Sequence, residues 1–205
     1  MNLDDFYNFF SAAKQIFEEN LNELCRLDSV LGDGDHGVSM LKGFKCIESD
    51  IQDRKYESIS DLLFNAGKTM MKEIGGTCGP LFAAVFMQAG MAAKGKTEIG
   101  TEDLALIFRR ASDAVMNLGK AKAGEKTMVD ALLPAAESLE FSKTEGKNVR
   151  EALTEAAEAA GRGAEATRNM LATKGRARYQ GEKSIGAVDP GAMSVCFIFK
   201  ALASV

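Results

Sequence analysis

Residues 3–26 have the sequence LDDFYNFFSAAKQIFEENLNELCR, and the spacing of apolar side chains in this stretch indicates the fold class. The apolar residues that recur every three or four positions are Phe6, Phe9, Phe10, Ala13, Phe17, Leu21 and Leu24. This spacing is the repeat of one face of an α-helix. One helix is therefore predicted from about Leu3 to Arg26.

The same helical period continues along nearly the whole chain. Further helices are predicted over residues 37–52, 58–73, from about 78 onward, 102–118, 127–141, 149–171, and from 189 to near the C-terminus. Pro80 falls in the first turn of its helix, where a missing N–H costs nothing. Thr127 and Asp130 have the spacing of a capping box, and Asp189 before Pro190 is a cap for the last helix.

No stretch alternates in polarity with period two over more than a few residues, so no sheet is expected. Eight helices with mostly short connections make consecutive helices antiparallel neighbours. The sequence therefore predicts an all-α protein, a bundle or barrel of eight antiparallel up-and-down helices. With 205 residues and no low-complexity linker, residues 1–205 are expected to form one domain.

Charge and cysteine content restrict the class of protein. The formal net charge is −4, which argues against a nucleic-acid-binding protein, because such proteins usually present a basic face. The N-terminal residues MNLDD are acidic where a signal peptide is basic. The four cysteines stand far apart without CxxC spacing, so reduced thiols in the cytoplasm are expected. They are Cys25, Cys46, Cys78 and Cys196.

Residues 77–93 contain no charged side chain and invite a membrane interpretation. However, the stretch contains Gly79, Pro80, Gln88 and Gly90, and it is shorter than the ~20 apolar residues that span a bilayer. A helix that is apolar all round is more simply the buried centre of a soluble bundle. No membrane segment is therefore expected.

The glycines cluster at the predicted helix junctions. Such clusters occur at residues 32–37, 75–79, 119–124, 175–181 and 186–191. In an up-and-down bundle, every second junction lies at the same end. These glycine-rich connections would therefore form a site at one rim of the bundle.

Three aspartates, Asp28, Asp33 and Asp35, lie within eight residues on a turn that Gly32 and Gly34 make tight. Hard cations such as Mg²⁺ prefer carboxylate oxygens, and carboxylates held together repel one another unless a cation neutralises them. The alternative is a solvated Asp-Gly turn that caps the next helix. Calcium is less suited, because the twelve-residue EF-hand loop and its distant Glu are missing.

The other polar features at these junctions have two interpretations each. His36 is the only histidine, and it is either a cap or packing residue or a contact to phosphate. Residues 75–80, GGTCGP, form a flexible helix start of the kind that binds anions, although no Walker A Gly-Lys-Ser/Thr follows. The basic stretch with Lys174, Arg176, Arg178 and Lys183 is either a solvated connection or a lid that clamps a phosphoryl group.

Five motifs, taken in order, resemble the L subunit of dihydroxyacetone kinases, the nucleotide-binding component of that family. They are residues 27–37 (LDSVLGDGDHG), 75–81 (GGTCGPL), 126–134 (KTMVDALLP), 174–179 (KGRARY) and 184–191 (SIGAVDPG). The resemblance implies a barrel of eight antiparallel helices that binds an adenine nucleotide, ADP or ATP, at one end. It also implies a catalytic group of Asp28, Asp33, Asp35 and Arg176, in which the aspartates hold two Mg²⁺ that bridge the phosphates.

The same resemblance implies the remaining nucleotide contacts. His36 and the backbone at Thr77 and Cys78 would face the phosphates, to which Arg176 would reach from the closing loop. Gly119 and Met128 would border the adenine. The expected nucleotide-binding residues are completed by Ser39, Gly76, Thr127 and Asp189.

Two positions depart from the family pattern. Cys78 replaces the usual Ser of the Gly-Gly-x-Ser-Gly loop, which removes a hydroxyl but leaves the backbone N–H groups. Glu125 stands where Asp is commoner, a change that we expect to be mild. Both leave nucleotide binding expected.

In bacterial members of the family the ketone is held on a separate K subunit, and the nucleotide is often rephosphorylated by a phosphotransferase-system protein, the M-type subunit. Other members use free ATP, and the sequence leaves the phosphate donor open. Two alternatives also stay open: a regulatory subunit whose nucleotide state a transcription factor reads, and a kinase subunit for a related sugar or acyl substrate. A di-iron bundle fits poorly because no Glu-x-x-His pair is present. The oligomeric state, including a homodimer, is not determined by the sequence.

Overall fold

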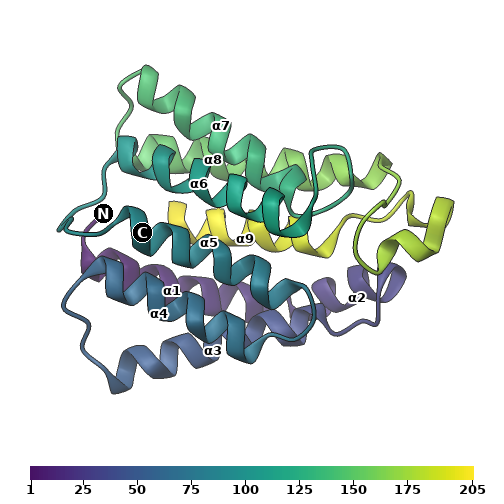
Figure 1. The fold of residues 1–205 in the computed structure, drawn as a ribbon, viewed down its shortest axis with the longest axis horizontal. Helices are drawn as coiled ribbons and strands as arrows, with labels where there is room; N and C mark the ends of the chain where they lie inside the picture. The colour runs from purple at the N-terminus through teal and green to yellow at the C-terminus, as the bar shows by residue number, and fades with distance from the viewer.

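The computed structural model describes residues 1–205, and it contains nine α-helices, two 3-10 helices and no β-strand (Figure 1). The helices are α1 (Leu3–Glu19), α2 (Leu21–Leu31), α3 (His36–Asp53), α4 (Ile59–Glu73), α5 (Cys78–Ala92), α6 (Thr101–Gly119), α7 (Val129–Thr144), α8 (Val149–Ala166), η1 (Thr167–Asn169), η2 (Ala177–Ser184) and α9 (Pro190–Ala203). The all-α prediction is confirmed.

The helices form a closed up-and-down barrel. Each helix packs against the next one in the chain, and α9 packs against α1, which closes the ring. α1 and α2 follow each other along one side of the barrel (Figure 1). Counted as one wall, they give the eight antiparallel walls that the sequence predicts.

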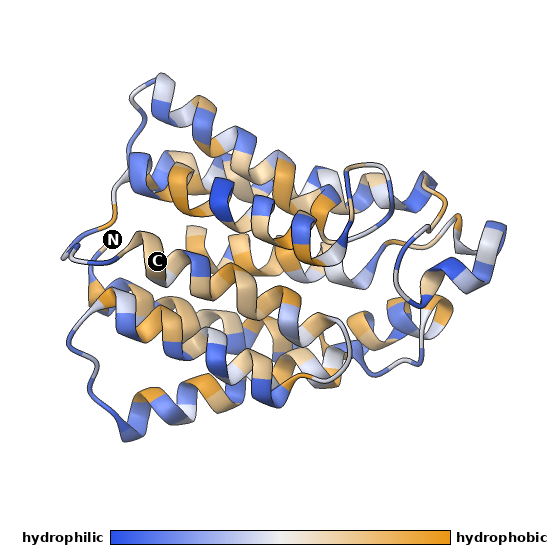
Figure 2. Ribbon diagram, in the orientation of Figure 1, coloured by the Kyte–Doolittle hydropathy of each residue, from blue (hydrophilic) through white to orange (hydrophobic).

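The interior of the barrel is apolar, and Figure 2 shows hydrophobic residues along all of its helices. One continuous cluster of 50 buried side chains fills it. Phenylalanines of α1 and α3 meet there, with the rings of Phe17 and Phe44 stacked at a centroid distance of 4.7 Å. Burial of each such ring contributes about 1.5–3 kcal/mol relative to exposure. α5 and α9, the most apolar helices, are parts of this barrel, and no helix has the length and hydrophobicity needed to cross a membrane.

The predicted first helix is wrong in one respect, because it is divided at Asn20. The Asn20 side-chain amide and its backbone N–H both donate to the carbonyl oxygen of Ile16, at 2.8 and 3.1 Å, and its φ and ψ are −106° and 13°. A side chain that competes for a backbone carbonyl favours a helix end. α2 then begins at Leu21 and continues to Leu31, past the predicted end at Arg26.

Two other helix boundaries differ from the prediction. α8 ends at Ala166 rather than near Leu171, because Thr167 donates its hydroxyl to the Ala164 carbonyl at 2.6 Å and starts the 3-10 turn η1. α7 begins at Val129, and only Asp130 performs its half of the expected capping box, accepting from the Thr127 N–H at 2.8 Å. The Thr127 hydroxyl instead accepts from the Val129 N–H.

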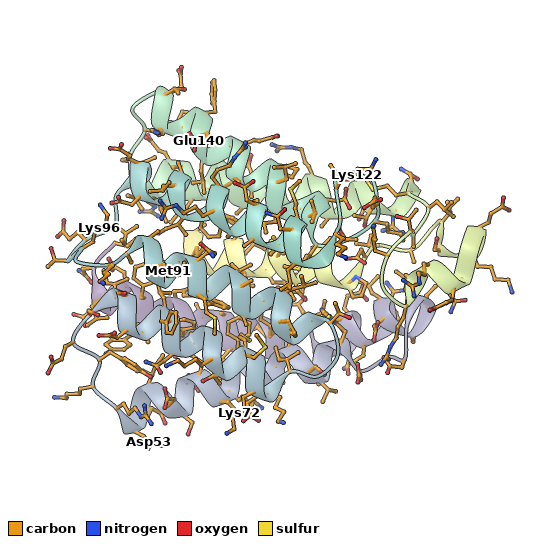
Figure 3. All side chains as sticks on the ribbon, viewed as in Figure 1. Asp53, Lys72, Met91, Lys96, Lys122 and Glu140 are labelled. Carbon is orange, nitrogen blue, oxygen red and sulfur yellow. The ribbon has the colours of Figure 1, made fainter.

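Because consecutive helices alternate in direction, the connections fall into two groups. The loop end of the barrel carries the connections 32–35, 74–77, 120–128 and 167–189 (right in Figure 1). The terminal end carries 54–58, 93–100, 145–148 and both chain termini. In Figure 3 the labelled Asp53 and Lys96 lie at the terminal end, and Lys122 lies toward the loop end. The glycine-rich junctions of the sequence thus meet at one rim, as expected.

Candidate functional site

A cavity of about 400 Å³ opens between the four connections of the loop end. All thirteen residues expected at the site line it. They are Asp28, Asp33, Asp35, His36, Ser39, Gly76, Thr77, Cys78, Gly119, Thr127, Met128, Arg176 and Asp189. The structure therefore brings the five motifs together around one volume, which we call the loop-end cavity.

The three aspartates form one corner of this cavity. Asp28 belongs to the last turn of α2, whereas Asp33 and Asp35 follow in the connection to α3. One carboxylate oxygen from each residue lies within 4.8 Å of the others. This donor set suits a hard divalent cation such as Mg²⁺, which is usually bound through a few carboxylates together with phosphate and water.

The backbone of the turn holds Asp28 in place. The Oδ2 atom of Asp28 accepts from the N–H groups of Asp35 and His36, at 3.0 and 3.2 Å. A Cβ at Gly32 would collide with the Asp28 carboxylate, and Gly34 has φ +80°, a conformation that favours glycine. The Asp-Gly turn is thus shaped around the Asp28 carboxylate, and cation binding by the three aspartates stays a prediction.

The start of α5 forms a second corner. Gly76 has φ +65°, and no atom lies within 4 Å of an added Cβ at Gly75 or Gly76. The backbone N–H groups of Cys78 and Gly79 have no hydrogen-bond partner in the protein, and the N-cap Thr77 makes no side-chain cap. Free N–H groups and the positive end of a helix dipole favour an anion at this place.

His36 connects three helices at the rim. Its Nε2 shares a 2.8 Å hydrogen bond with Ser194 Oγ on α9, and its Nδ1 lies 3.7 Å from Cys78 Sγ on α5. The ring is only 5% exposed, and burial lowers the pKa of His36 to about 4, so the imidazole is neutral. The His36 side chain therefore connects α3 with α9 and α5, and its contact with phosphate stays a prediction.

Cys78, the departure from the family pattern, keeps an uncharged side chain at the cavity wall. Burial raises the pKa of the thiol to about 12, with further contributions from the charges of Asp189 and Asp28. The free backbone N–H of the same residue survives the change from serine, as expected from the sequence.

Another part of the cavity wall is apolar. Leu81, Phe82, Val115 and Val129 line it beside Gly119 and Met128. A Cβ at Gly119 would meet Leu81 at 3.5 Å, an ordinary van der Waals contact, so packing within the protein does not require glycine there. A flat apolar ring such as a nucleobase suits this wall, whereas the acidic and N–H-rich corners suit charged groups.

The basic residues of the stretch 174–178 have different partners. Arg176 lines the cavity and forms an ion pair with Asp33, so it already reaches the acidic corner. Lys174 pairs with Glu125 at 3.5 Å. Arg178 instead stacks on the exposed Tyr179, 4.7 Å from the ring centroid, and points to no cavity residue. Of the two interpretations of this stretch, the lid fits Arg176 and the solvated connection fits Arg178.

Two buried polar residues at the site were missed by sequence reasoning. Lys126 is 1% exposed and donates to the carbonyls of Thr167 and Ala187, at 2.6 and 2.5 Å. Ser194 is fully buried and holds His36. Lysine is usually exposed and serine is common in helices, so neither residue type signals its position. The only hint was that Lys126 is the first residue of the motif 126–134.

Asp189 is the half-buried cap of α9 at the cavity wall, accepting from the Ala192 N–H at 2.8 Å. Burial raises the pKa of its carboxyl to about 7, against the opposing effects of the Ala192 N–H and the Lys126 charge. The expected cap is therefore present, and it titrates near neutral pH.

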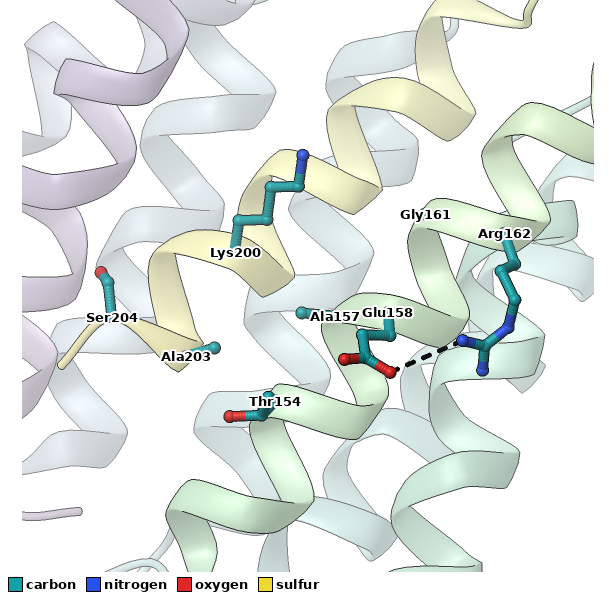
Figure 4. Close-up of a pocket in the computed structure, with 8 residues that line it drawn as sticks. All are labelled: Thr154, Ala157, Glu158, Gly161, Arg162, Lys200, Ala203 and Ser204. Atoms are coloured by element: carbon teal, nitrogen blue, oxygen red, sulfur yellow. Dashed lines mark ion pairs between the residues drawn. The ribbon is translucent and has the colours of Figure 1, made fainter.

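A second hollow lies on the outer surface between α8 and α9, toward the terminal end (Figure 4). Its volume is about 550 Å³, and its lining includes the exposed ion pair of Glu158 and Arg162 at 3.7 Å. It is an open groove without a carboxylate cluster or a helix start.

The chain is similar to known kinase subunits and kinases. The model of the DAK2 domain matches residues 30–204. The ADP-binding subunit DhaL of the PEP-dependent dihydroxyacetone kinase of Escherichia coli K12 is 38% identical over 96% of this chain and 93% of its own length. The corresponding subunit of the PTS-dependent kinase of Lactococcus lactis is 31% identical over 100% and 98% of the two chains.

The fold is similar to that of a larger enzyme. The crystal structure of the dihydroxyacetone kinase of C. freundii matches with a TM-score of 0.75 and 26% identity. The match covers 97% of this chain and 34% of that one, so this chain spans about a third of that kinase. The complex of the same enzyme with AMP-PNP and Mg²⁺ matches with a TM-score of 0.73. The family model and the nearly full-length relatives show that the chain belongs to the DAK2 domain family.

Proposed function

We propose that this chain is the ADP-binding subunit of a dihydroxyacetone kinase, and that residues 1–205 act as one nucleotide-binding domain. One observation carries the proposal: the loop-end cavity combines three clustered carboxylates, a helix start with free N–H groups and an apolar wall. These three surfaces match the metal, phosphate and base of a nucleotide. The DhaL relatives, which are named as ADP-binding subunits, support the same assignment.

Each surface has a role in this proposal. Asp28, Asp33 and Asp35 would hold two Mg²⁺, which neutralise phosphate charge when bound. The backbone at Cys78 and the Arg176 guanidinium would donate to the phosphates, with Arg176 exchanging its Asp33 partner for phosphate. The remaining contacts would come from the other cavity residues, with Gly119 and Met128 at the adenine. Phosphoryl transfer depends mainly on positioning and charge neutralisation, which this arrangement supplies.

The acceptor ketone would come from a separate K-type subunit. The cavity contains no second polar cluster suited to a small polyol, and the ring nitrogens of the lone His36 already face Ser194 and Cys78. Large apolar side chains stay exposed around the loop end, with Tyr179 77% exposed and Val30, Val38 and Ile185 also accessible. Such residues are typical of a docking surface. The partner would cover the cavity there.

The phosphate donor is proposed to be a phosphotransferase-system protein that rephosphorylates bound ADP. The support is the similarity to the DhaL subunits, which are named as parts of PEP-dependent and PTS-dependent kinases. The L-erythrulose kinase of Pectobacterium atrosepticum is also similar, at 34% identity. The same erythrulose kinase makes a four-carbon ketose the second candidate acceptor. A cytoplasmic location fits the four free cysteines. A homodimer and a role toward a transcription factor stay predictions.

The direct test is to denature the purified protein and identify any nucleotide released, then to titrate the nucleotide-free protein with ADP by calorimetry with and without Mg²⁺. We expect ADP binding that depends on Mg²⁺. We also expect negligible phosphorylation of dihydroxyacetone by the isolated chain, and turnover once a K-type subunit and a donor are added. Absence of ADP and ATP binding in the presence of Mg²⁺ would refute the proposal, and steady turnover by the isolated chain would refute the two-subunit arrangement.

A further inference from the structure

The segment 168–188 carries Arg176 to the cavity, and its two ends are joined to each other. The Gly186 N–H donates to the Arg168 carbonyl at 2.7 Å, and the Asp189 N–H donates to the Thr167 hydroxyl at 2.9 Å. The Arg168 guanidinium also donates to the Gly186 carbonyl at 3.0 Å. The segment is therefore a loop with a closed base, lying between α8 and α9 (Figure 1).

Lys126 belongs to a different connection, but its ammonium group lies in the base of this loop. Its Nζ donates to the Thr167 carbonyl at 2.6 Å on one end of the loop and to the Ala187 carbonyl at 2.5 Å on the other. The attraction between the Lys126 ammonium and the Asp189 carboxylate adds to these bonds. One cation thus connects the two ends of the loop with the connection 120–128.

The position of Lys126 is demanding in two ways. Its backbone φ is +59°, a left-handed conformation that non-glycine residues rarely adopt. Its ammonium is buried, and a buried charge is costly unless it is paired and hydrogen-bonded. The left-handed backbone and the buried ammonium thus occur in one residue, at the point where the loop 168–188 joins the cavity wall. With only 1% of its surface exposed, Lys126 has little room for direct contact with a ligand.

We propose that Lys126 is a positioning residue for the phosphate end of the nucleotide, acting by clamping the base of the loop that carries Arg176. This inference rests on the proposed function, since it requires that Arg176 contacts the nucleotide phosphates. Without the ammonium, the Thr167 and Ala187 carbonyls lose a shared donor and the Asp189 carboxylate loses its compensating charge. The loop base then opens, and Arg176 spends less time at the phosphates.

The test is a double-mutant cycle on ADP affinity, measured by calorimetry in the presence of Mg²⁺ on the full chain. Lys126→Met keeps the length of the side chain and removes its charge. Because a small misplacement of a contact can lower its effect by up to roughly a hundredfold, we expect Lys126→Met to weaken ADP binding about tenfold or more. In the Arg176→Ala background, the same substitution should have little further effect on ADP affinity.

Two readouts separate this role from a general loss of structure. Adenosine, which lacks phosphates, should bind Lys126→Met as it binds the unsubstituted protein. Amide hydrogen exchange of residues 168–188 should accelerate, with that of the terminal-end helices unchanged. Equal losses of adenosine and ADP affinity, or additive effects of Lys126→Met and Arg176→Ala, would overturn the proposal.

A second variant covers the case in which Lys126→Met does not fold. Thr167→Val removes the hydroxyl that accepts from the Asp189 N–H at the same loop base but keeps Lys126. This variant should also weaken ADP binding, and again only when Arg176 is present. An unchanged ADP affinity of Thr167→Val would count against the proposed role of the loop base. If Arg176→Ala alone leaves ADP affinity unchanged, the proposed role of Arg176 fails instead. The two failures are therefore distinguishable.

Discussion

The two ends of the barrel begin their helices in opposite ways. At the terminal end, Asn2, Ser58 and Asn148 have extended backbones, and each accepts a backbone N–H from the first turn of its helix, at 3.0–3.1 Å. At the loop end, the N-cap residues of α3, α5 and α7 have helical backbones and form no side-chain cap. These residues are Asp35, Thr77 and Met128.

This difference indicates what each end is for. An extended N-cap residue can turn its side chain back onto the first free N–H groups, which stabilises a helix start by about 1 kcal/mol. A helical backbone at the same position directs the side chain elsewhere, and at α5 the N–H groups of Cys78 and Gly79 stay available to a ligand. At α3 and α7 other groups of the protein accept from the first N–H, namely Asp28 from His36 and the Thr127 hydroxyl from Val129. The caps of the terminal end thus stabilise its helix starts, whereas at the loop end the start of α5 leaves its donors to an anion. Each end has one exception: Asp189 caps α9 at the loop end, and at the terminal end the N-cap of α6 is Gly100, which forms no side-chain cap.

The acidic corner provides the largest expected effect. Asp33→Asn or Asp35→Asn should reduce phosphoryl transfer in the reconstituted kinase on the order of a thousandfold, as loss of a group that stabilises transferring charge does. The fold should persist, because removing one charge lowers repulsion among the carboxylates. Asp53→Asn, the same change at the terminal end, is the matched control. Normal activity and Mg²⁺ dependence in both loop-end variants would refute the metal assignment.

The capped exception at the loop end predicts a pH dependence. Burial raises the pKa of Asp189 to about 7, well above the ordinary value of an aspartate carboxyl. A folded-state pKa above the unfolded one means that the folded protein binds more protons, so this contribution to stability is full below about pH 4 and is lost as pH rises through 7. The difference in unfolding free energy between the unsubstituted protein and Asp189→Asn should therefore fall by about 2–4 kcal/mol from pH 4 to pH 8.

This difference is measured by denaturant titration of both proteins without nucleotide. Asn retains a side-chain oxygen that can accept from the Ala192 N–H, so the cap itself is preserved. A difference in unfolding free energy that stays constant over this pH range would show that Asp189 is ionised throughout.

A negative charge at the start of α5 tests the comparison of the two ends directly. Thr77→Asp should stabilise the nucleotide-free protein by about 0.3–1 kcal/mol through the helix dipole. It should also weaken ADP binding by roughly tenfold or more, because like charges at this distance repel. Ser58→Asp makes the same change at the terminal end and should leave ADP affinity unaltered. Thermal melts measure the stability of both variants, and calorimetry measures their ADP affinity. Equal ADP affinities of Thr77→Asp and Ser58→Asp would contradict an anion site at α5.

The helical period of the apolar residues predicted most of the fold. The predictions that were wrong concern single helix boundaries. The break at Asn20 left the apolar stripe of Phe17, Leu21 and Leu24 intact, because α2 restarts along the same side of the barrel. Hydrophobic spacing reports which face is buried and is insensitive to one side chain that competes for a carbonyl. The early end of α8 has the same origin, in the Thr167 hydroxyl.

The candidate site was predictable where residue type carries the chemistry and unpredictable where burial does. Clustered aspartates and glycines point to a cation and to a tight turn in any context, so Asp28 and Gly76 could be selected from the sequence. Lys126 and Ser194 matter because the fold buries them against Thr167 and His36, far away in the chain. No local sequence pattern predicts a contact with a residue so far away in the chain. Arg178, chosen with Arg176 for its charge alone, lies on Tyr179 instead.

The smallest expected effect comes from the terminal end. Asn148→Ala removes the side chain that accepts from the Glu151 N–H, whereas the reciprocal bond from the Asn148 N–H to Glu151 is retained. Loss of an N-cap costs about 1 kcal/mol, which lowers the melting temperature of a chain of this size by about 2–4 °C. The connection 145–148 lies at the opposite end from the cavity, so nothing that holds the nucleotide moves. ADP with Mg²⁺ at about 100 times its Kd should add the same 2.7 kcal/mol to the variant and to the unsubstituted protein. Parallel melting curves with and without ligand measure this, and a change in the ligand-induced shift would mean that the two ends are coupled through the barrel rather than independent.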